Sequence, residues 1–265
     1  TGLLRHPTNE ALRTKISSGR LAPARLHRQL LRLVYRLLFL MVAEERRMIV
    51  VHANAATTYT PLGPSIAFMP TFDCNLRCIY CYAKGGEDQT SLPLATAKHA
   101  INWTASKTDD PHAKPLTVYF VGGGEPFMNF RVMDEICRYS RERFASVEVV
   151  VVSNGIHGQK QRHWLIENKA STRISFDGVM HAKNRPLATH APSDTIVKQT
   201  IKELVAAGVP LTVQLTITRD GTAHMFESIE LISSLGARYI KIEPVHHSVL
   251  SRGEQSLVPD LDEFV

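Results

Sequence analysis

Three of the four cysteines lie within eight residues, with the spacing Cys-x3-Cys-x2-Cys at Cys74, Cys78 and Cys81. They directly follow an apolar segment, residues 65–69, whose pattern predicts a strand. Cysteine thiolates are soft ligands that suit zinc or iron–sulfur clusters, and so short a loop can surround a compact centre. A closed structural zinc site needs four protein ligands. The spacing therefore predicts a metal centre with one position open to a further ligand.

Two plainer interpretations of this loop remain open. A zinc knuckle would need a fourth ligand nearby, and the closest downstream candidate, His99, falls in a segment predicted to be helical. Alternatively, the three cysteines are unrelated buried thiols, which is the simplest interpretation of Cys137 in the predicted helix 129–144.

The loop at residues 74–81, which reads CNLRCIYC, resembles the signature of the radical S-adenosylmethionine (SAM) enzymes. In that family three cysteines ligate three irons of a [4Fe-4S] cluster, and SAM chelates the fourth. One-electron reduction of the SAM sulfonium releases a 5′-deoxyadenosyl radical, which abstracts a hydrogen from the substrate. The resemblance implies both cofactors here and places Tyr80 beside the adenine, although a lone aromatic is more often a packing residue. The implied metal ligands are Cys74, Cys78 and Cys81.

From residue 65 onward, apolar strand-like runs alternate with helix-like stretches, which predicts a parallel sheet covered by helices. The strand-like runs are residues 66–70, 117–121, 147–152, 173–176, 211–217 and 239–243. The helix-like stretches lie near residues 93–106, 129–144, 158–168, 193–207 and 222–235. The resemblance implies that these units form an α/β fold, a partial (β/α)6 TIM-type barrel. Active sites of α/β barrels lie at the C-terminal ends of the strands.

A glycine-rich turn follows the second predicted strand and reads GGGEP at residues 122–126. Glycines at a strand end let the backbone approach a ligand closely. A tight strand-to-helix turn would explain the glycines equally well, but the turn lies one βα unit after the cysteine loop. The resemblance implies that its backbone holds the amino end of SAM, through Gly123, Gly124 and Glu125.

The next three strand ends carry further candidates for contacts to SAM. Ser153 and Asn154 have short polar side chains that suit a ribose or a carboxylate, although Ser-Asn-Gly is also a common turn. Ser175 and Arg185 match a serine and an arginine of the peptide-modifying branch of the family, and the planar fork of arginine pairs with carboxylates. Leu215 matches an apolar residue near the adenine, but a core leucine is an equally good interpretation.

The charge divides the chain into unlike parts. Residues 1–50 contain ten basic residues (Lys and Arg) and three acidic ones (Asp and Glu). The remaining 215 residues contain 21 basic and 22 acidic residues. The leucines of this N-terminal part recur at steps of three and four, which predicts a basic amphipathic helical segment. Residues 1–47 weakly resemble a helical segment of restriction–modification adenine methyltransferases, without the catalytic motifs of that family. We expect a linker at 51–64, a catalytic core at 65–258 and the start of a further, truncated segment at 259–265.

The resemblance implies a radical SAM enzyme that modifies a peptide or protein, most similar to the SPASM-type branch with the anaerobic sulfatase maturases. No cysteine follows Cys137 to hold auxiliary clusters, so we expect either a truncated chain or an external one-electron donor such as flavodoxin or ferredoxin. Two alternatives are radical chemistry on a small molecule or cofactor precursor, and a non-enzymatic metal-binding module with a nucleic-acid-binding helix. Clustered cysteines without a signal peptide or an apolar span indicate a cytoplasmic protein with no membrane partner, and a nucleic-acid partner is not expected.

Overall fold

The computed structural model describes residues 63–246 and 257–259. The predicted N-terminal helical segment, most of the predicted linker and residues 260–265 lie outside the described residues. The strands are β1 (Ser65–Phe68), β2 (Pro115–Phe120), β3 (Ser146–Ser153), β4 (Ser171–Ser175), β5 (Leu211–Ile217) and β6 (Tyr239–Pro244). The α-helices are α4 (Leu94–Ser106), α5 (Phe130–Arg141), α6 (Gln159–Glu167), α7 (His181–Asn184), α8 (Asp194–Ala206) and α9 (Met225–Ser234).

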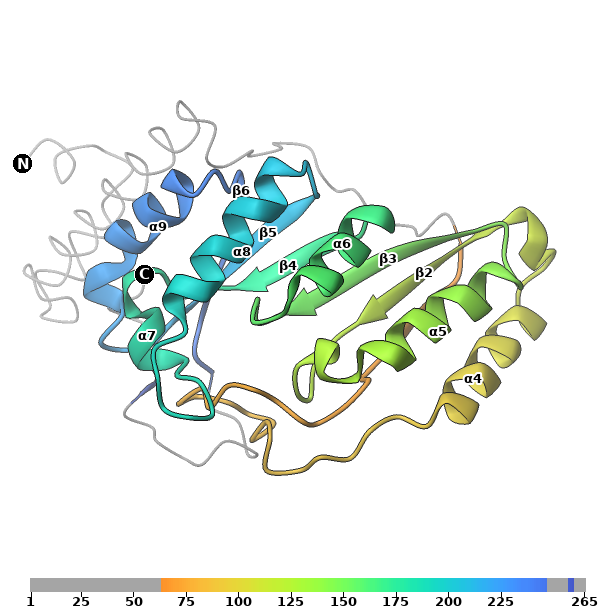
Figure 1. The fold of residues 1–265 in the computed structure, drawn as a ribbon, viewed down its shortest axis with the longest axis horizontal. Helices are drawn as coiled ribbons and strands as arrows, with labels where there is room; N and C mark the ends of the chain where they lie inside the picture. Colours follow the sequence, from red (N-terminus) through yellow and green to blue (C-terminus); the bar gives the residue numbers. More distant parts are fainter. Residues whose placement is uncertain (1–62, 247–256, 260–265) are drawn as a thin grey trace, which may run out of the picture. The chain divides into compact units, whose positions relative to one another are not determined.

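The six strands form one parallel sheet in the order β1-β2-β3-β4-β5-β6, so every strand pairs with the next one along the chain. Helices α5, α6 and α8 cover one face of this sheet (Figure 1). The strands and helices predicted from the apolar pattern are confirmed. Helix α7 is the exception, because four residues are too few to show a helical period in the sequence.

The core lies between the sheet and these helices. On α8, Val197, Ile201 and Leu204 follow one another at steps of four and three and are fully buried. Phe120 at the end of β2 packs against Trp164 of α6, with ring centroids 6.3 Å apart. This aromatic packing anchors the ends of the strands, where the candidate site residues begin.

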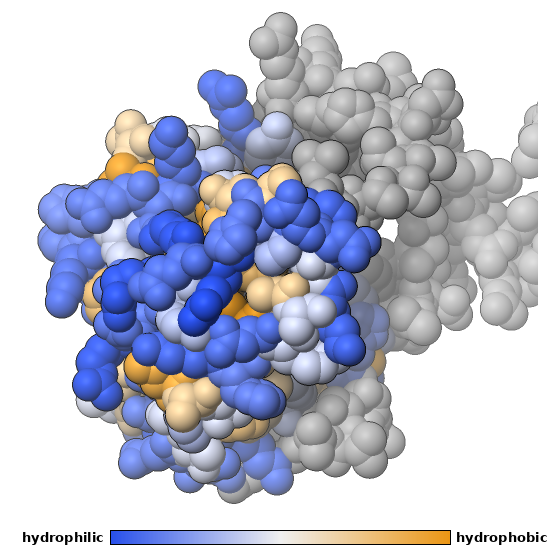
Figure 2. Space-filling view, turned by 90° about the vertical axis from the view of Figure 1, so that its right-hand side faces the viewer, coloured by the Kyte–Doolittle hydropathy of each residue, from blue (hydrophilic) through white to orange (hydrophobic). Residues whose placement is uncertain are grey.

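The opposite end of the domain, where β2 and β3 begin, faces the viewer in Figure 2 and is mostly hydrophilic, with small apolar patches. In an α/β barrel this end serves stability, whereas chemistry takes place at the carboxyl ends of the strands. In the described part of the chain, no helix has both the length and the apolar character that a membrane crossing requires.

We expect Phe120→Ala to lower the free energy of unfolding by about 3–5 kcal/mol, because it removes a fully buried ring from between the sheet and α6. Urea denaturation followed by circular dichroism measures the loss. Trp103→Ala is the matched control, since the Trp103 side chain on α4 is 60% exposed. The control should stay within about 0.5 kcal/mol of the wild type. Equal losses in the two variants would contradict the placement of Phe120 in the core.

Candidate active site

The glycine turn after β2 packs directly against the chain that leads into the cysteine loop. The backbone N–H of Gly124 donates to the carbonyl of Thr71 (3.0 Å), and that of Glu125 donates to the carbonyl of Asp73 (2.9 Å). A Cβ atom on Gly124 would lie 2.0 Å from the Asp73 carbonyl oxygen, and one on Gly123 would lie 2.5 Å from the ring of Phe72. The close approach therefore requires glycine at both positions.

The segment that follows α7 holds the other side of the cysteine loop. The backbone N–H of Arg77 donates to the carbonyl of Pro186 (2.8 Å), and that of Ile79 donates to the carbonyl of Asn184 (3.0 Å). The loop is thus held between the glycine turn after β2 and residues that follow β4.

Arg77 also fastens the loop from within, a role that the sequence alone did not suggest. Its Nη1 donates to the carbonyls of Cys74 (2.7 Å) and Leu76 (2.8 Å), and its Nη2 reaches the carbonyl of Gly86 (3.4 Å). Arginine suits this task because its guanidinium carries five N–H donors in a rigid fork.

The three cysteine sulfurs face N–H donors from three different parts of the chain. The sulfur of Cys81 accepts from the backbone N–H of Gly85 (3.3 Å), while those of Cys74 and Cys78 lie near donors described below. Burial raises the pKa of Cys74 to about 12, with smaller contributions from Glu125 and from the thiolate charges of Cys78 and Cys81. Gly85 lies beside two of the sulfurs, because its N–H donates to Cys81 and a Cβ atom on it would lie 3.6 Å from the sulfur of Cys74.

The three cysteine thiols are a donor set that suits an iron–sulfur cluster. Within the described residues, no group of three or more His, Cys, Asp or Glu side chains is arranged to hold one metal ion. Zinc needs each sulfur within about 2.3 Å of the ion, which draws the sulfurs together. The cysteine ligands of an iron–sulfur cluster bind separate irons, so their sulfurs stand further apart. Three soft thiolates on one loop have the ligand chemistry that such a cluster requires.

The side chain of Glu125 is buried and joins the glycine turn to the end of β3. Its carboxylate accepts from the Ser153 hydroxyl (2.9 Å), the backbone N–H of Asn154 (2.7 Å) and the backbone N–H of Phe127 (3.3 Å). Burial raises the pKa of Glu125 to about 7, although these donors oppose the shift. The Ser153 hydroxyl and the Glu125 carboxylate are therefore engaged with each other, while their predicted contacts to SAM stay predictions.

Asn154 reaches back from β3 to the cysteine loop. Its amide nitrogen donates to the side-chain oxygen of Asn75 (2.7 Å) and lies 3.8 Å from the sulfur of Cys74. Its amide oxygen accepts from the backbone N–H of Ile156 (2.9 Å). With both ends of the amide engaged and 8% of the residue exposed, the orientation of this side chain is fixed.

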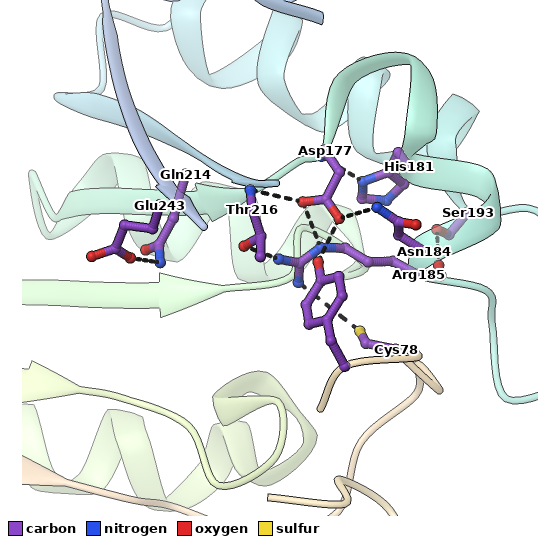
Figure 3. Close-up of polar contacts among 10 residues, drawn as sticks. Cys78, Asp177, His181, Asn184, Arg185, Ser193, Gln214, Thr216 and Glu243 are labelled. Atoms are coloured by element: carbon purple, nitrogen blue, oxygen red, sulfur yellow. Dashed lines mark hydrogen bonds and ion pairs between the residues drawn. The ribbon is translucent and has the colours of Figure 1, made fainter. Parts of the chain in front are cut away.

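A buried carboxylate, Asp177, accepts hydrogen bonds from three segments of the chain at the end of β4 (Figure 3). Its Oδ1 accepts from Nε of Arg185 (3.1 Å) and from the backbone N–H of Thr216 (3.2 Å). Its Oδ2 accepts from the Tyr80 hydroxyl and from the Asn184 amide (3.3 Å). The sequence analysis assigned no role to Asp177, because its central place depends on contacts with Tyr80 and Thr216, which are distant in sequence.

Arg185 extends this network to the cysteine loop. Its Nη2 donates to the hydroxyl of Thr216 (3.2 Å), its Nη1 lies 4.0 Å from the sulfur of Cys78, and its guanidinium carbon lies 5.2 Å from the centre of the Tyr80 ring. Burial alone would lower the pKa of Arg185, but the charges of Asp177, Tyr80 and Cys78 together with the Asp177 hydrogen bond outweigh burial and raise it above its ordinary value. The structure thus brings together three of the predicted site residues: Cys78, Tyr80 and Arg185.

His181 on α7 supports the backbone of this network. The backbone N–H of Asp177 donates to Nδ1 of His181 (3.1 Å), and the imidazole lies against the ring of Phe176. Burial, with a smaller contribution from Arg185, lowers the pKa of His181 to about 2. The neutral ring accepts at Nδ1, so its proton is on Nε2.

Ser175 and Leu215 are the two remaining predicted contacts. Ser175 lies on β4 opposite Gln214 of β5 and is half-buried. Leu215 is 1% exposed and belongs to the buried row of β5, whereas Gln214 and Thr216 lie on the other face of the strand. The structure therefore places Leu215 in the core, and both SAM contacts stay predictions.

Polar side chains on the other face of β5 contact polar side chains of β6, and the sequence analysis did not predict these contacts. Gln214 donates to the carboxylate of Glu243 on β6 (2.8 Å), and Glu243 also pairs with Lys241 (2.7 Å). The alternation of polar and apolar residues along β5 is the signal that could have revealed Gln214 and Thr216. An open depression of about 670 Å³ lies elsewhere, between α5 and α6, and includes none of the predicted site residues.

We expect Gly124→Ala to destabilise the fold by about 1–3 kcal/mol, because the added Cβ overlaps the backbone that leads into the cysteine loop. Gly158→Ala is the matched control, since a Cβ there meets only a side-chain oxygen of Gln161, at 3.2 Å. Urea denaturation compares the two variants. A Gly124→Ala variant as stable as the control would show that the turn and the loop are not packed as described.

The raised pKa of Glu125 predicts a pH dependence of stability. Because the folded chain holds this proton up to about pH 7 and the unfolded chain only to about 4.5, stability falls as the pH rises through this window. The loss amounts to at most roughly 3 kcal/mol. Urea denaturation between about pH 5 and 8 measures this dependence. Glu125→Gln should flatten the decline in stability, whereas Glu230→Gln, at an exposed glutamate, should retain it. If the stability of Glu125→Gln fell with rising pH as steeply as that of the wild type, the pH dependence could not be assigned to Glu125.

Two curated proteins are similar to this chain. An uncharacterised protein of Methanocaldococcus jannaschii is 23% identical over 195 residues, which cover 72% of this chain and 65% of that protein. An S-adenosylmethionine-dependent nucleotide dehydratase of Psychrobacter lutiphocae is 28% identical over 119 residues, which cover 42% of this chain and 39% of the dehydratase. The chain thus spans less than two thirds of the length of these relatives.

Solved structures share the fold at low identity. The structure of anSMEcpe with bound AdoMet and Kp18Cys peptide has a TM-score of 0.67 and 15% identity, over 76% of this chain and 57% of that chain. Streptococcus suis SuiB bound to S-adenosylmethionine has a TM-score of 0.54 and 13% identity, over 76% of this chain and 44% of SuiB. These likenesses confirm the predicted α/β fold with a partial (β/α)6 barrel.

The sequence model of the Radical SAM superfamily matches residues 68–232. This span covers more than half of the chain and runs from the end of β1 into α9. It includes the cysteine loop, the glycine turn and the buried network around Asp177. The chain therefore belongs to the radical SAM superfamily of enzymes.

Proposed function

We propose that the chain binds a [4Fe-4S] cluster through Cys74, Cys78 and Cys81 and cleaves SAM reductively beside it. The observation that carries this proposal is the position of the cysteine loop at the carboxyl ends of a parallel sheet, with Cys74 and Cys81 beside Gly85 and Cys78 beside Arg185. When bound, the cluster and SAM supply a 5′-deoxyadenosyl radical that abstracts hydrogen from a substrate.

The residues around the sulfurs have the chemistry to hold SAM. The glycine turn packs closely on the cysteine loop, and a Cβ on Gly85 would lie 3.5 Å from the Gly123 carbonyl oxygen and 3.6 Å from the Cys74 sulfur, so a carbonyl that suits an ammonium lies near the loop. Arg185 uses three of its five N–H donors for Asp177, Thr216 and Cys78, which leaves one on each Nη for a carboxylate. Ser175 has a half-buried hydroxyl on the same side of the sheet as Gln214, where it suits a ribose or carboxylate oxygen.

The network around Asp177 has a positioning role in this proposal. Asp177 holds Nε of Arg185 and the Tyr80 hydroxyl at the same time, so the guanidinium and the ring cannot turn independently. His181 in turn fixes the backbone of Asp177. A ligand that binds between the loop and β5 would therefore meet groups that are already oriented.

We propose a peptide or protein as the substrate. The Ser175 and Arg185 positions match the peptide-modifying branch, and the fold is that of anSMEcpe and SuiB, whose structures include peptide complexes. The electron would come from an external one-electron donor such as flavodoxin or ferredoxin. We also propose that the protein works in the cytoplasm, which suits reduced thiols.

A nucleotide-like small molecule is the second candidate substrate. It is favoured by the similarity to the S-adenosylmethionine-dependent nucleotide dehydratase. Product analysis by mass spectrometry after incubation with candidate peptides and with nucleoside triphosphates separates the two. A new mass on the peptide supports the first candidate, whereas a modified nucleotide supports the second.

We expect Cys78→Ala to abolish the formation of 5′-deoxyadenosine from SAM after anaerobic reconstitution with iron and sulfide. Removal of one of three sulfur ligands should also lower the iron content well below four per chain. Cys137→Ala is the matched control, because Cys137 is buried in α5 and lies outside the cysteine loop. The control should retain both iron and product. Wild-type product formation by Cys78→Ala would refute the proposed cluster site.

A further inference from the structure

Each of the three loop cysteines has its own N–H donor, and the donors come from different parts of the fold. Cys81 has the backbone N–H of Gly85 at 3.3 Å. Cys74 has the side-chain amide of Asn154 at 3.8 Å, and Cys78 has the guanidinium of Arg185 at 4.0 Å. Two of the three donors are thus side chains that reach the sulfurs from the ends of other βα units.

The Asn154 amide is held in place by groups other than the sulfur. The side-chain oxygen of Asn75 accepts a hydrogen bond from the same amide nitrogen (2.7 Å). The backbone N–H of Ile156 donates to the amide oxygen of Asn154 (2.9 Å). The amide therefore cannot flip without losing both bonds, and its N–H side stays directed toward Cys74. A donor fixed in this way acts on the sulfur whether or not SAM is bound.

An N–H group directed at a cluster sulfur stabilises negative charge on that sulfur. Since reduction adds an electron to the cluster, such donors favour the reduced form and raise the reduction potential. The charge of Arg185 acts in the same sense at Cys78, because its Nη1 lies 4.0 Å from the sulfur. Low solvent exposure strengthens both effects, because Asn154 and Arg185 are each 8% exposed.

We propose that Asn154 tunes the reduction potential of the cluster through the sulfur of Cys74, as a positioning residue of the cluster and not as a contact to SAM. Arg185 adds a second donor at Cys78 while it serves the SAM carboxylate. This inference rests on the proposed function, because it needs the cluster at this loop. It gives Asn154 a role that survives when SAM is absent.

The test uses the whole chain, reconstituted anaerobically with iron and sulfide but without SAM. The midpoint potential is measured by redox titration with mediators, with the reduced cluster followed by electron paramagnetic resonance. Asn154→Ala removes the amide, and Asn154→Asp keeps its shape and the acceptor for Ile156 while it replaces the N–H donor. Asn129→Ala is the matched control, because the Asn129 amide donates to the carbonyl of Pro70 (2.9 Å) and to no cysteine sulfur.

We expect both Asn154 variants to shift the midpoint to a more negative value, with the larger shift for Asn154→Asp because it adds a negative charge. Asn129→Ala should keep the wild-type midpoint. A wild-type midpoint in a loaded Asn154 variant overturns the inference, and so does loss of iron from both Asn154 variants while the control keeps its iron. If the wild-type chain itself holds no [4Fe-4S] cluster, the proposed function fails first and the inference fails with it.

Discussion

The buried carboxylate of Asp177 is the contact on which the candidate site depends. A charge removed from water is costly unless it is paired and hydrogen-bonded, and Asp177 receives the guanidinium of Arg185 together with hydroxyl, amide and backbone donors. These partners come from the cysteine loop, from α7 and from β5. The loss of any one of them would leave the remaining charges under-compensated, so the parts of the site are held in a single arrangement.

A second buried carboxylate, Glu125, has the corresponding role on the other side of the cysteine loop. It ties the glycine turn after β2 to the end of β3, and Asn154 continues the link to Asn75 inside the loop. The loop therefore has little freedom, although it contains no regular secondary structure of its own. Its position is determined by polar contacts to three strand ends together with the buried side chain of Leu76.

Much of the fold could be predicted from the sequence, because apolar runs and helical periods are local signals. The cysteine spacing, the glycine turn and Arg185 were likewise recognisable as short motifs. The contacts of Glu125 with Ser153, of Asn154 with Asn75 and of Asp177 with Tyr80 were not, because each joins residues that are far apart in the sequence. The position of Leu215 was also not predictable from its motif. Neighbouring residues along β5 face opposite sides of the sheet, so Leu215 lies in the core while Thr216 faces the Asp177 network.

The strictly sequential strand order has a consequence for the way the chain assembles. Every strand pairs with its neighbour in sequence, so the sheet can grow one βα unit at a time as the polypeptide emerges. The cysteine loop differs, because it docks on Pro186 and Asn184, about a hundred residues later in synthesis. The loop is thus expected to reach its final position only after the fourth βα unit has folded.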